Sequence, residues 1–189
     1  MEGTIRNVAV IGHSGEGKTT LVEAILFNAG AIDRQGKVDD GNTVSDFDQE
    51  EIARKTSISL SVSRCEYTDR KNRHVVFNLI DVPGFFDFEG EANMALSAVD
   101  NAVIVTGAGG TLTVGTEKAI EYCLSHRIPS LLFINGLDKE NANFIKTVAA
   151  IKEKYGNKIA PMIIPNMVDE KMKGFVKVAY GVLRDWERN

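Results

Sequence analysis

The sequence has few of the residues that build disulfide frameworks or zinc sites. It contains only two cysteines, Cys65 and Cys123, among 189 residues, and neither lies in a CxxC or Cys/His motif. A disulfide framework needs more cysteines than this, and a zinc site needs ligands at characteristic spacings, so the sequence suggests neither. This sparse use of cysteine indicates a reducing, cytoplasmic setting.

Long hydrophobic runs, a signal peptide and an excess of positive charge are also missing. No apolar stretch approaches the roughly 18 residues of a membrane-spanning helix, and the first residues lack the basic start of a secretory signal. The 22 Lys and Arg against 26 Asp and Glu give a net charge of −4, which argues against DNA binding through charge alone. We expect a monomer that binds neither membranes nor DNA. With 43% hydrophobic residues, the chain can build one sizeable core.

Short apolar runs rich in β-branched residues alternate with longer amphipathic segments, which predicts an α/β fold. Strands are expected at 7–11, 58–66, 74–80, 102–106, 131–134 and 162–164, and helices at 19–28, 90–99, 116–126 and 142–155. The second and third strands are separated by residues 69–72, too few for a crossover, so these strands should form an antiparallel hairpin at the sheet edge. The prediction is a three-layer sandwich around a mostly parallel sheet with one antiparallel edge strand.

A polar stretch between residues 30 and 56 shows little periodicity. It holds seven acids: Asp33, Asp39, Asp40, Asp46, Asp48, Glu50 and Glu51. A loop of this length inside a compact domain is usually functional or mobile. Residues 166–189 fit the alternating pattern least well.

A phosphate-binding motif follows the first strand. Residues 12–19 read GHSGEGKT and match GxxxxGK[ST], between an apolar strand and a helix. Glycines allow the tight turn that points backbone N–H groups at phosphate oxygens, and the helix adds its positive N-terminal end. Lys18 should contact the β- and γ-phosphates, and the Thr19 hydroxyl should ligate Mg²⁺. The expected nucleotide-binding residues of this P-loop NTPase fold are Gly12, His13, Ser14, Gly15, Glu16, Gly17, Lys18, Thr19 and Thr20.

Two more motifs lie at the carboxyl ends of strands, where open α/β sheets bind ligands. In DVPG, residues 81–84, Asp81 should hold Mg²⁺ through water and Gly84 should offer its N–H to the γ-phosphate. In NGLD, residues 135–138, Asp138 could accept from the N1–H and amino group of guanine, a donor pair that adenine lacks. The three motifs in this order favour GTP. A P-loop ATPase or a kinase-like transferase is the alternative, and it would leave Asp138 without a role.

These motifs make the sequence resemble the translational GTPases, most closely the elongation factor G family and its divergent elongation-factor-G-like members. The resemblance covers nearly the whole chain, through residues 12–32, 54–58, 81–91 and 133–144. It implies a GTP-binding domain that uses GTP or GDP and Mg²⁺, hydrolyses GTP and acts on the ribosome in the full-length relative. Ribosomal-protection factors against tetracycline share the motifs and are a family-level alternative.

The resemblance also implies roles at matched positions. Lys18 and Thr19 match the phosphate loop, Asp81 and Gly84 the family's counterpart of DVPG, and Asn135 and Asp138 its base-reading motif. Residues 54–58 resemble the family's RGITI, which places Ser57 where a threonine hydroxyl senses Mg²⁺ and γ-phosphate; Thr56 is an alternative one residue away. The acidic stretch then becomes the first switch, and residues 85–91 become the second.

The sequence departs from the family at several of these positions. Gly15 replaces an aspartate near the phosphates, and Gly136 replaces a lysine whose stem covers the guanine. Phe85 replaces the histidine that positions the attacking water. Because a phenyl ring cannot orient water, we expect slow or partner-dependent hydrolysis. A hydrolysis-deficient, nucleotide-responsive binding module is the alternative.

The family's last guanine-contact motif, a short Ser-Ala turn, is not found before the end of the chain at Asn189. Residues 1–160 are therefore interpreted as the GTP-binding domain. Residues 161–189 are interpreted as a tail that resembles the start of the insertion preceding that motif. On this interpretation the chain is an N-terminal fragment or an abbreviated form of its relatives.

Overall fold

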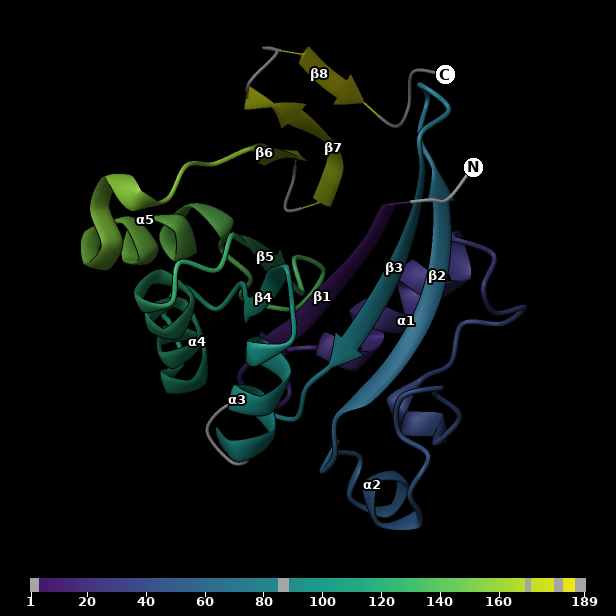
Figure 1. The fold of residues 1–189 in the computed structure, drawn as a ribbon. Helices are drawn as coiled ribbons and strands as arrows, with labels where there is room; N and C mark the ends of the chain where they lie inside the picture. Colours follow the sequence, from purple (N-terminus) through teal and green to yellow (C-terminus); the bar gives the residue numbers. More distant parts are fainter. Residues whose placement is uncertain (1–3, 85–88, 169–170, 179–181, 186–189) are drawn as a thin grey trace. The chain divides into compact units, whose positions relative to one another are not determined.

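The computed structural model describes residues 4–84, 89–168, 171–178 and 182–185. The elements in chain order are β1 (Thr4–Gly12), α1 (Lys18–Asn28), the 3-10 turn η1 (Val38–Asp40), α2 (Gln49–Arg54), β2 (Ser61–Thr68), β3 (His74–Asp81), α3 (Glu89–Ser97), β4 (Asn101–Gly107), α4 (Val114–Ser125), β5 (Ser130–Asn135), α5 (Phe144–Tyr155), the 3-10 turn η2 (Gly156–Lys158), β6 (Ile163–Val168), β7 (Lys171–Lys177) and β8 (Val182–Asp185) (Figure 1). They divide into two compact units, Met1–Thr106 with Thr113–Phe133, and Gly107–Leu112 with Ile134–Asn189. The boundary between a domain of residues 1–160 and a tail stays a prediction.

The five-stranded sheet has the order β2-β3-β1-β4-β5. Strand β1 runs parallel to both β3 and β4, whereas β2 pairs antiparallel with β3 from Ser61 opposite Asp81 to Thr68 opposite His74. The predicted edge hairpin is therefore confirmed. Its turn is closed by the Asp69 carboxylate, which accepts the backbone N–H groups of Lys71 and Arg73 at 2.8 and 2.9 Å.

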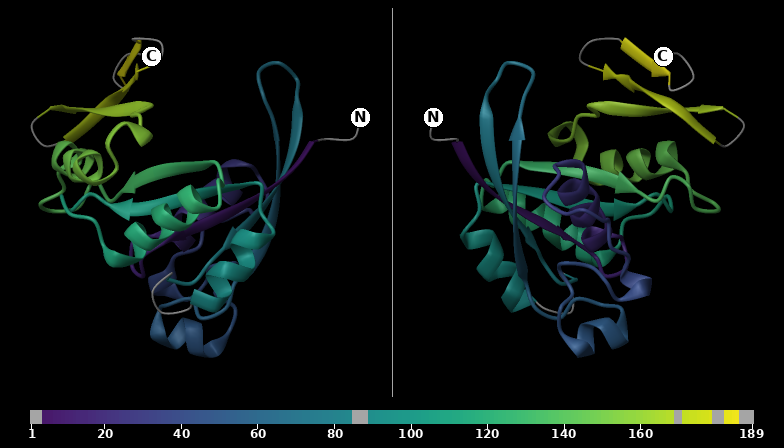
Figure 2. Two further views of the ribbon diagram at one scale, coloured as in Figure 1. Left: turned by 60° about the vertical axis from the view of Figure 1, so that its left-hand side comes forward. Right: turned by 90° about the vertical axis from the view of Figure 1, so that its right-hand side faces the viewer.

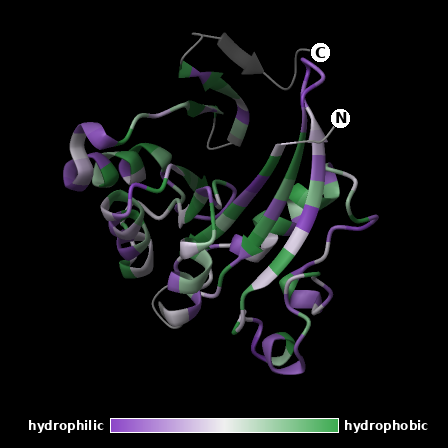
Figure 3. Cartoon of the chain, in the orientation of Figure 1, coloured by the Kyte–Doolittle hydropathy of each residue, from purple (hydrophilic) through white to green (hydrophobic). Residues whose placement is uncertain are grey.

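The core of the first unit lies on both faces of this sheet. Helix α1 covers one face, and α3 and α4 lie on the other (Figure 2). The face under α1 is packed by apolar side chains from four strands and the helix: Val8, Val10, Val22, Leu26, Cys65, Leu79 and Val105. Hydrophobic residues gather at the carboxyl end of β3, while the β2–β3 turn is hydrophilic (Figure 3). The carboxyl ends of β1 and β3, where the phosphate loop and the DVPG motif begin, are the most buried parts of these two strands.

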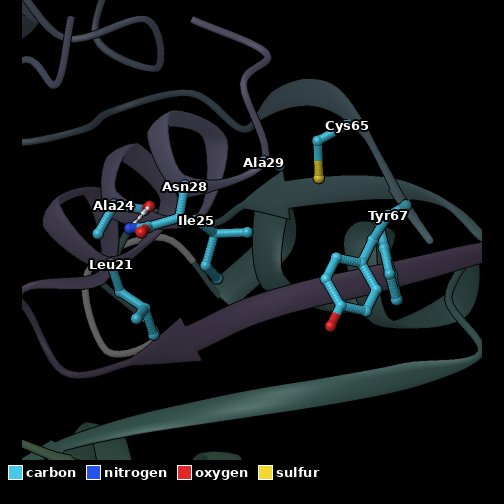
Figure 4. A pocket seen from close by; sticks show the side chains of 8 residues that line it. Leu21, Ala24, Ile25, Asn28, Ala29, Cys65 and Tyr67 are labelled. Carbon is cyan, nitrogen blue, oxygen red and sulfur yellow. Dashed lines mark hydrogen bonds between the residues drawn. The ribbon is translucent and has the colours of Figure 1, made fainter. Parts of the chain in front are cut away.

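Beside this core, α1 and the β2–β3 pair form an apolar pocket of about 380 Å³ (Figure 4). It is lined by Leu21, Ala24, Ile25, Asn28, Ala29, Cys65, Tyr67 and Phe77. None of these residues belongs to the predicted site. Burial raises the pKa of the Cys65 thiol, so this cysteine is held in its neutral form as part of the apolar wall.

The second unit contains α5 and a three-stranded antiparallel sheet of order β6-β7-β8. Helix α5 begins where the Asn143 side chain accepts the N–H of Lys146 at 2.9 Å, a regular N-terminal cap. The strand expected at 162–164 is present as β6, but β7 and β8 were not predicted. None of the described helices is long and apolar enough to cross a membrane.

The acidic stretch before β2 is fastened to the first unit by buried carboxylates. Glu23 of α1 is completely buried, and its carboxylate accepts the N–H groups of Gly36 and Val44 at 2.7 and 2.5 Å. Glu51 of α2 is also buried and accepts from the backbone of Ile58 and Ser59 at 2.9 and 3.0 Å. The predicted polar loop therefore follows a defined course, with η1 and α2 within it.

Replacing Glu23 by alanine should destabilise the fold. The substitution leaves the two backbone N–H groups without their acceptor, and each lost bond to a buried carboxylate costs about 1–3 kcal/mol, so we expect a loss of about 2–6 kcal/mol. Urea denaturation of Glu23→Ala measures the loss. The control is Glu50→Ala, which removes an exposed ion pair to Arg54 and should cost far less. Equal losses in both variants would contradict the anchoring role of Glu23.

Candidate nucleotide-binding site

The phosphate loop begins where β1 passes close to β4. Gly12 has a φ of +146°, and a Cβ atom at this position would overlap the carbonyl oxygen of Val105. At the other end of the loop, Gly17 adopts a left-handed conformation, with φ 89° and ψ 31°, and forms the N-cap of α1. Both conformations favour glycine, so the sequence of the motif dictates this tight strand-to-helix turn.

Inside the turn, the Lys18 side chain is almost completely buried. Its Nζ donates to the carbonyl oxygen of His13 at 2.9 Å, which holds the ammonium group across the loop. Gly84 lies directly against the loop, because a Cβ built on it would be 2.9 Å from the Cβ of Ser14. Gly15 and Thr20 are exposed. The structure thus brings Lys18 and Gly84 to the same loop from distant parts of the sequence.

Next to the loop, oxygen-bearing side chains from three segments meet. The hydroxyls of Thr19 and Ser57 are 3.2 Å apart, and Ser57 Oγ donates to Oδ1 of Asp46 at 2.6 Å. Asp46 is buried and also accepts from the hydroxyl of Thr43. The alternative residue Thr56 instead bonds to the carbonyl of Arg54, at 3.3 Å. Of the two candidates, Ser57 is the one whose hydroxyl lies within hydrogen-bond distance of the Thr19 hydroxyl.

Asp81, at the end of β3, is buried beside this group of hydroxyls. Neither of its carboxylate oxygens has a hydrogen-bond partner within the described part of the chain. Burial raises the pKa of Asp81 to about 6, and the nearby charge of Asp46 adds to the rise. The hydroxyls of Thr19 and Ser45, which lie near the carboxylate without meeting the geometry of a hydrogen bond, offset part of the rise, and so does the charge of Lys18. An orphaned buried carboxylate is costly unless a cation or donor satisfies it.

The NGLD motif belongs to the second unit, and its geometry is local to that unit. Asn135 ends β5, where its carbonyl accepts the N–H of Ala108 at 3.0 Å. Gly136 has a φ of +72°, and a Cβ built on it would lie 3.2 Å from Cδ of Lys139. The aliphatic stem of Lys139 therefore lies beside Gly136. The side chain of Asp138 is exposed.

Among the predicted site residues, Lys18, Thr19, Ser57, Asp81 and Gly84 are brought together in the first unit. Phe85 lies outside the described residues. Sequence reasoning missed Asp46, which it counted only as one of seven acids in the polar stretch. The spacing of 11 residues between Asp46 and Ser57 carries no motif, so no sequence signal paired them. The roles of all these residues remain predictions.

A glycine turn between a buried strand and a helix, with buried oxygen donors at the next strand end, defines a P-loop nucleotide-binding domain. Residues 3–182 match the family described as the elongation factor Tu GTP binding domain. The chain belongs to this family, which confirms the predicted fold class and the resemblance to the translational GTPases.

Several curated relatives are similar over most of the chain. An elongation factor G-like protein of Mycobacterium tuberculosis is 37% identical over 164 residues, which is 87% of this chain and 22% of the relative. The mitochondrial ribosome-releasing factor 2 of Culex quinquefasciatus is 32% identical over 188 residues, 100% of this chain and 24% of the relative. Elongation factor G of Granulibacter bethesdensis is 33% identical over 186 residues, which is 97% of this chain and 26% of the relative.

A solved structure has the same fold. A crystal structure of a protein from Thermus thermophilus superposes with a TM-score of 0.87 at 32% identity, covering 98% of this chain and 27% of that one. The chain spans about a quarter of the length of the curated relatives it matches.

The buried Asp81 should make stability depend on pH. Its pKa is raised from 3.8 to about 6 in the folded protein, so folding favours the protonated form. Stability is then lost as the pH rises through that range, by about 3 kcal/mol for a shift of about two units. Relative to the wild type, Asp81→Asn should gain about this much stability between pH 4 and pH 7.5, measured by urea denaturation without Mg²⁺ or nucleotide.

Asp69→Asn is the matched control. Hydrogen bonds from Arg73 lower the pKa of Asp69, so this carboxylate is ionised in both the folded and the unfolded protein at neutral pH. Between pH 5 and pH 7.5 its effect on stability should not change. A pH-independent effect of Asp81→Asn over the full range would contradict the raised pKa.

Proposed function

We propose that the chain binds GTP and GDP with Mg²⁺, and that cleavage of the terminal phosphate moves the segments around Ser57 and Gly84. In the whole protein, this switch would act on the ribosome in the cytoplasm, as part of an elongation-factor-G-like GTPase. The observation that carries the proposal is the group formed by Thr19, Ser57 and the unpartnered, buried Asp81 beside the phosphate loop. Buried oxygens of this kind need a cation or donors to satisfy them.

The donor set fits Mg²⁺, because a hard ion prefers hydroxyl and carboxylate oxygens and keeps several waters. The Thr19 and Ser57 hydroxyls would hold the ion directly, and Asp81 would hold it through water. When bound, Mg²⁺ supplies positive charge that neutralises the phosphates. The backbone N–H groups of the loop and the Lys18 ammonium bind the phosphates, so the chain contributes mainly positioning and charge.

The base would be read in the second unit. Asp138 can accept both the N1–H and the amino group of guanine, and its exposed carboxylate is available to a ligand. The stem of Lys139 lies beside Gly136 and offers apolar cover of the kind that a side chain at position 136 would give. This arrangement supports guanine selectivity despite the glycine in the motif.

A link between the two proposed switch segments supports coupled movement. The backbone N–H of Leu60, three residues after Ser57, donates to the Glu91 carboxylate of α3 at 3.2 Å. Gly84, which would offer its N–H to the γ-phosphate, precedes α3 in the chain. A change at either segment can therefore act on the other through this bond.

Nucleotide titration tests the proposed binding. Wild-type protein with Mg²⁺ should bind fluorescent GDP and GTP, and Lys18→Ala should weaken binding by about 100-fold or more because a buried cation is removed from the phosphate site. Far-UV circular dichroism verifies that Lys18→Ala is folded. An affinity of this variant within a few-fold of the wild-type value would contradict the assignment of the phosphate loop.

The same titration with the adenine nucleotides ADP and ATP separates GTPase from ATPase function. The wild type should prefer GDP to ADP, and Asp138→Ala should lose most of that preference, since the site can no longer pair with the guanine donors. A preference for adenine nucleotides that is unchanged in Asp138→Ala would instead favour the ATPase or transferase alternative.

The identity of residue 85 decides between slow hydrolysis and a binding module that does not hydrolyse GTP. Phe85 cannot orient water, so single-turnover hydrolysis should be slow in the wild type, and Phe85→His should raise ribosome-stimulated turnover by about 10-fold or more. Phosphate release equal to the protein-free control in the wild type, with and without ribosomes, would favour the binding module.

A further inference from the structure

Glu16 lies in the middle of the phosphate loop but points away from it. The sequence places this residue among the nucleotide contacts, yet its two carboxylate oxygens accept the hydroxyls of Thr113 and Thr116, both at 2.9 Å. The two hydroxyls are also 3.0 Å from each other. Glu16 therefore connects the phosphate loop to the start of α4, which lies about one hundred residues further along the chain.

The two threonines serve this contact rather than the helix itself. Thr113 is the N-cap residue of α4, but its side chain makes no capping hydrogen bond. Thr116, in the first turn, is completely buried. The carboxylate of Glu16 thus lies at the first turn of a helix of 12 residues, where the helix dipole favours negative charge.

A second close contact joins the same helical turn to the other side of the loop. Gly115 is buried in the first turn of α4, and a Cβ built on it would be 2.7 Å from Nδ1 and 2.9 Å from Cα of His13. Helix α4 therefore packs directly on the backbone of the loop. His13 and Glu16 contact one turn of one helix from two positions in the phosphate loop.

This anchoring addresses a physical weakness of the loop. Gly12, Gly15 and Gly17 all have positive φ, and glycine loses more conformational freedom on ordering than any other residue. A loop that must hold several N–H groups in one direction needs an outside constraint to reduce the entropy lost on binding. A carboxylate left in the loop would also repel phosphate, and its bonds to α4 turn that charge outward.

We propose that Glu16 is a positioning residue that anchors the phosphate loop to the first turn of α4 through Thr113 and Thr116, and that nucleotide affinity depends on this anchor. The anchor acts through the backbone of the loop and does not touch the nucleotide. This inference rests on the proposed nucleotide binding, but the anchor itself can be measured without nucleotide.

Hydrogen exchange in the nucleotide-free protein tests the anchor directly. Glu16→Ala should increase the exchange rate of the amides of residues 14–18 by about 10-fold, because the loop loses both bonds to α4, while amides in the centre of β3 keep their wild-type rates. Glu16→Gln retains an oxygen that accepts from a hydroxyl and should restore much of the protection. Unchanged exchange in Glu16→Ala would overturn the proposal, whether or not the wild type binds nucleotide.

GDP affinity tests the functional consequence. Measured well below the melting temperature, Glu16→Ala should bind GDP about 10- to 100-fold more weakly, with Glu16→Gln in between. Thr116→Val should weaken binding about 3- to 10-fold, and it should have no further effect when combined with Glu16→Ala. Additive losses would show that the residues act independently, which would overturn the proposal.

Thr106→Val is the matched control for Thr116→Val. Thr106 is also completely buried in the first unit, but its hydroxyl has no hydrogen-bond partner among the residues that the structure describes. Its replacement should leave GDP affinity near the wild-type value. An equal loss in both valine variants would indicate a general packing effect and overturn the proposal. A wild type that shows the protected loop but binds no GDP would contradict only the proposed function.

Discussion

The arrangement of the first unit depends on the close approach of β1 to β4 at Gly12. Because the Val105 carbonyl occupies the space of a side chain at this position, the chain leaves the sheet at a residue without a Cβ atom and turns through the phosphate loop into α1. The parallel pairing of β1 with both β3 and β4 then fixes where the neighbouring strands end. Asp81 and the phosphate loop are consequently brought to one edge of the sheet, as open α/β sheets require of a ligand site.

Two groups of acids in and around the segment between α1 and β2 have different physical roles. Glu23, Asp46 and Glu51 are buried, and each accepts at least two hydrogen bonds from the segment between α1 and β2. Others, such as Glu50 and Asp39, make exposed ion pairs that contribute little to stability. The buried carboxylates therefore give a polar segment a defined course without an apolar core of its own. Buried, hydrogen-bonded carboxylates of this kind are costly to leave unpaired, so the segment and α1 are ordered together.

Much of the fold could be predicted because its signals are local. Apolar runs mark β1, β3 and β4, and the short turn at Asp69 dictates the hairpin. Helix α2 was missed because its six residues are mostly polar and its stability comes from the capping box of Asp48 and Glu51. Two pairings could not be predicted because they follow from packing. Thr116 lies 100 residues after its partner Glu16, and Asp46 lies 11 residues before its partner Ser57. The sequence motif is sufficient to recognise the phosphate loop, but it does not predict in which direction each side chain of the loop points.

The hydrogen bonds around Ser57 are compatible with a metal ligand at this position. A serine hydroxyl has one proton and two lone pairs, and Ser57 gives its proton to Asp46. Thr19 must then be the donor in the contact between the two hydroxyls, which occupies one lone pair of Ser57. A cation bound between Thr19 and Ser57 would replace that contact but leave the bond to Asp46 intact. Asp46 would therefore orient the Ser57 oxygen in the same way with and without the ion, as the outer partners of metal ligands do.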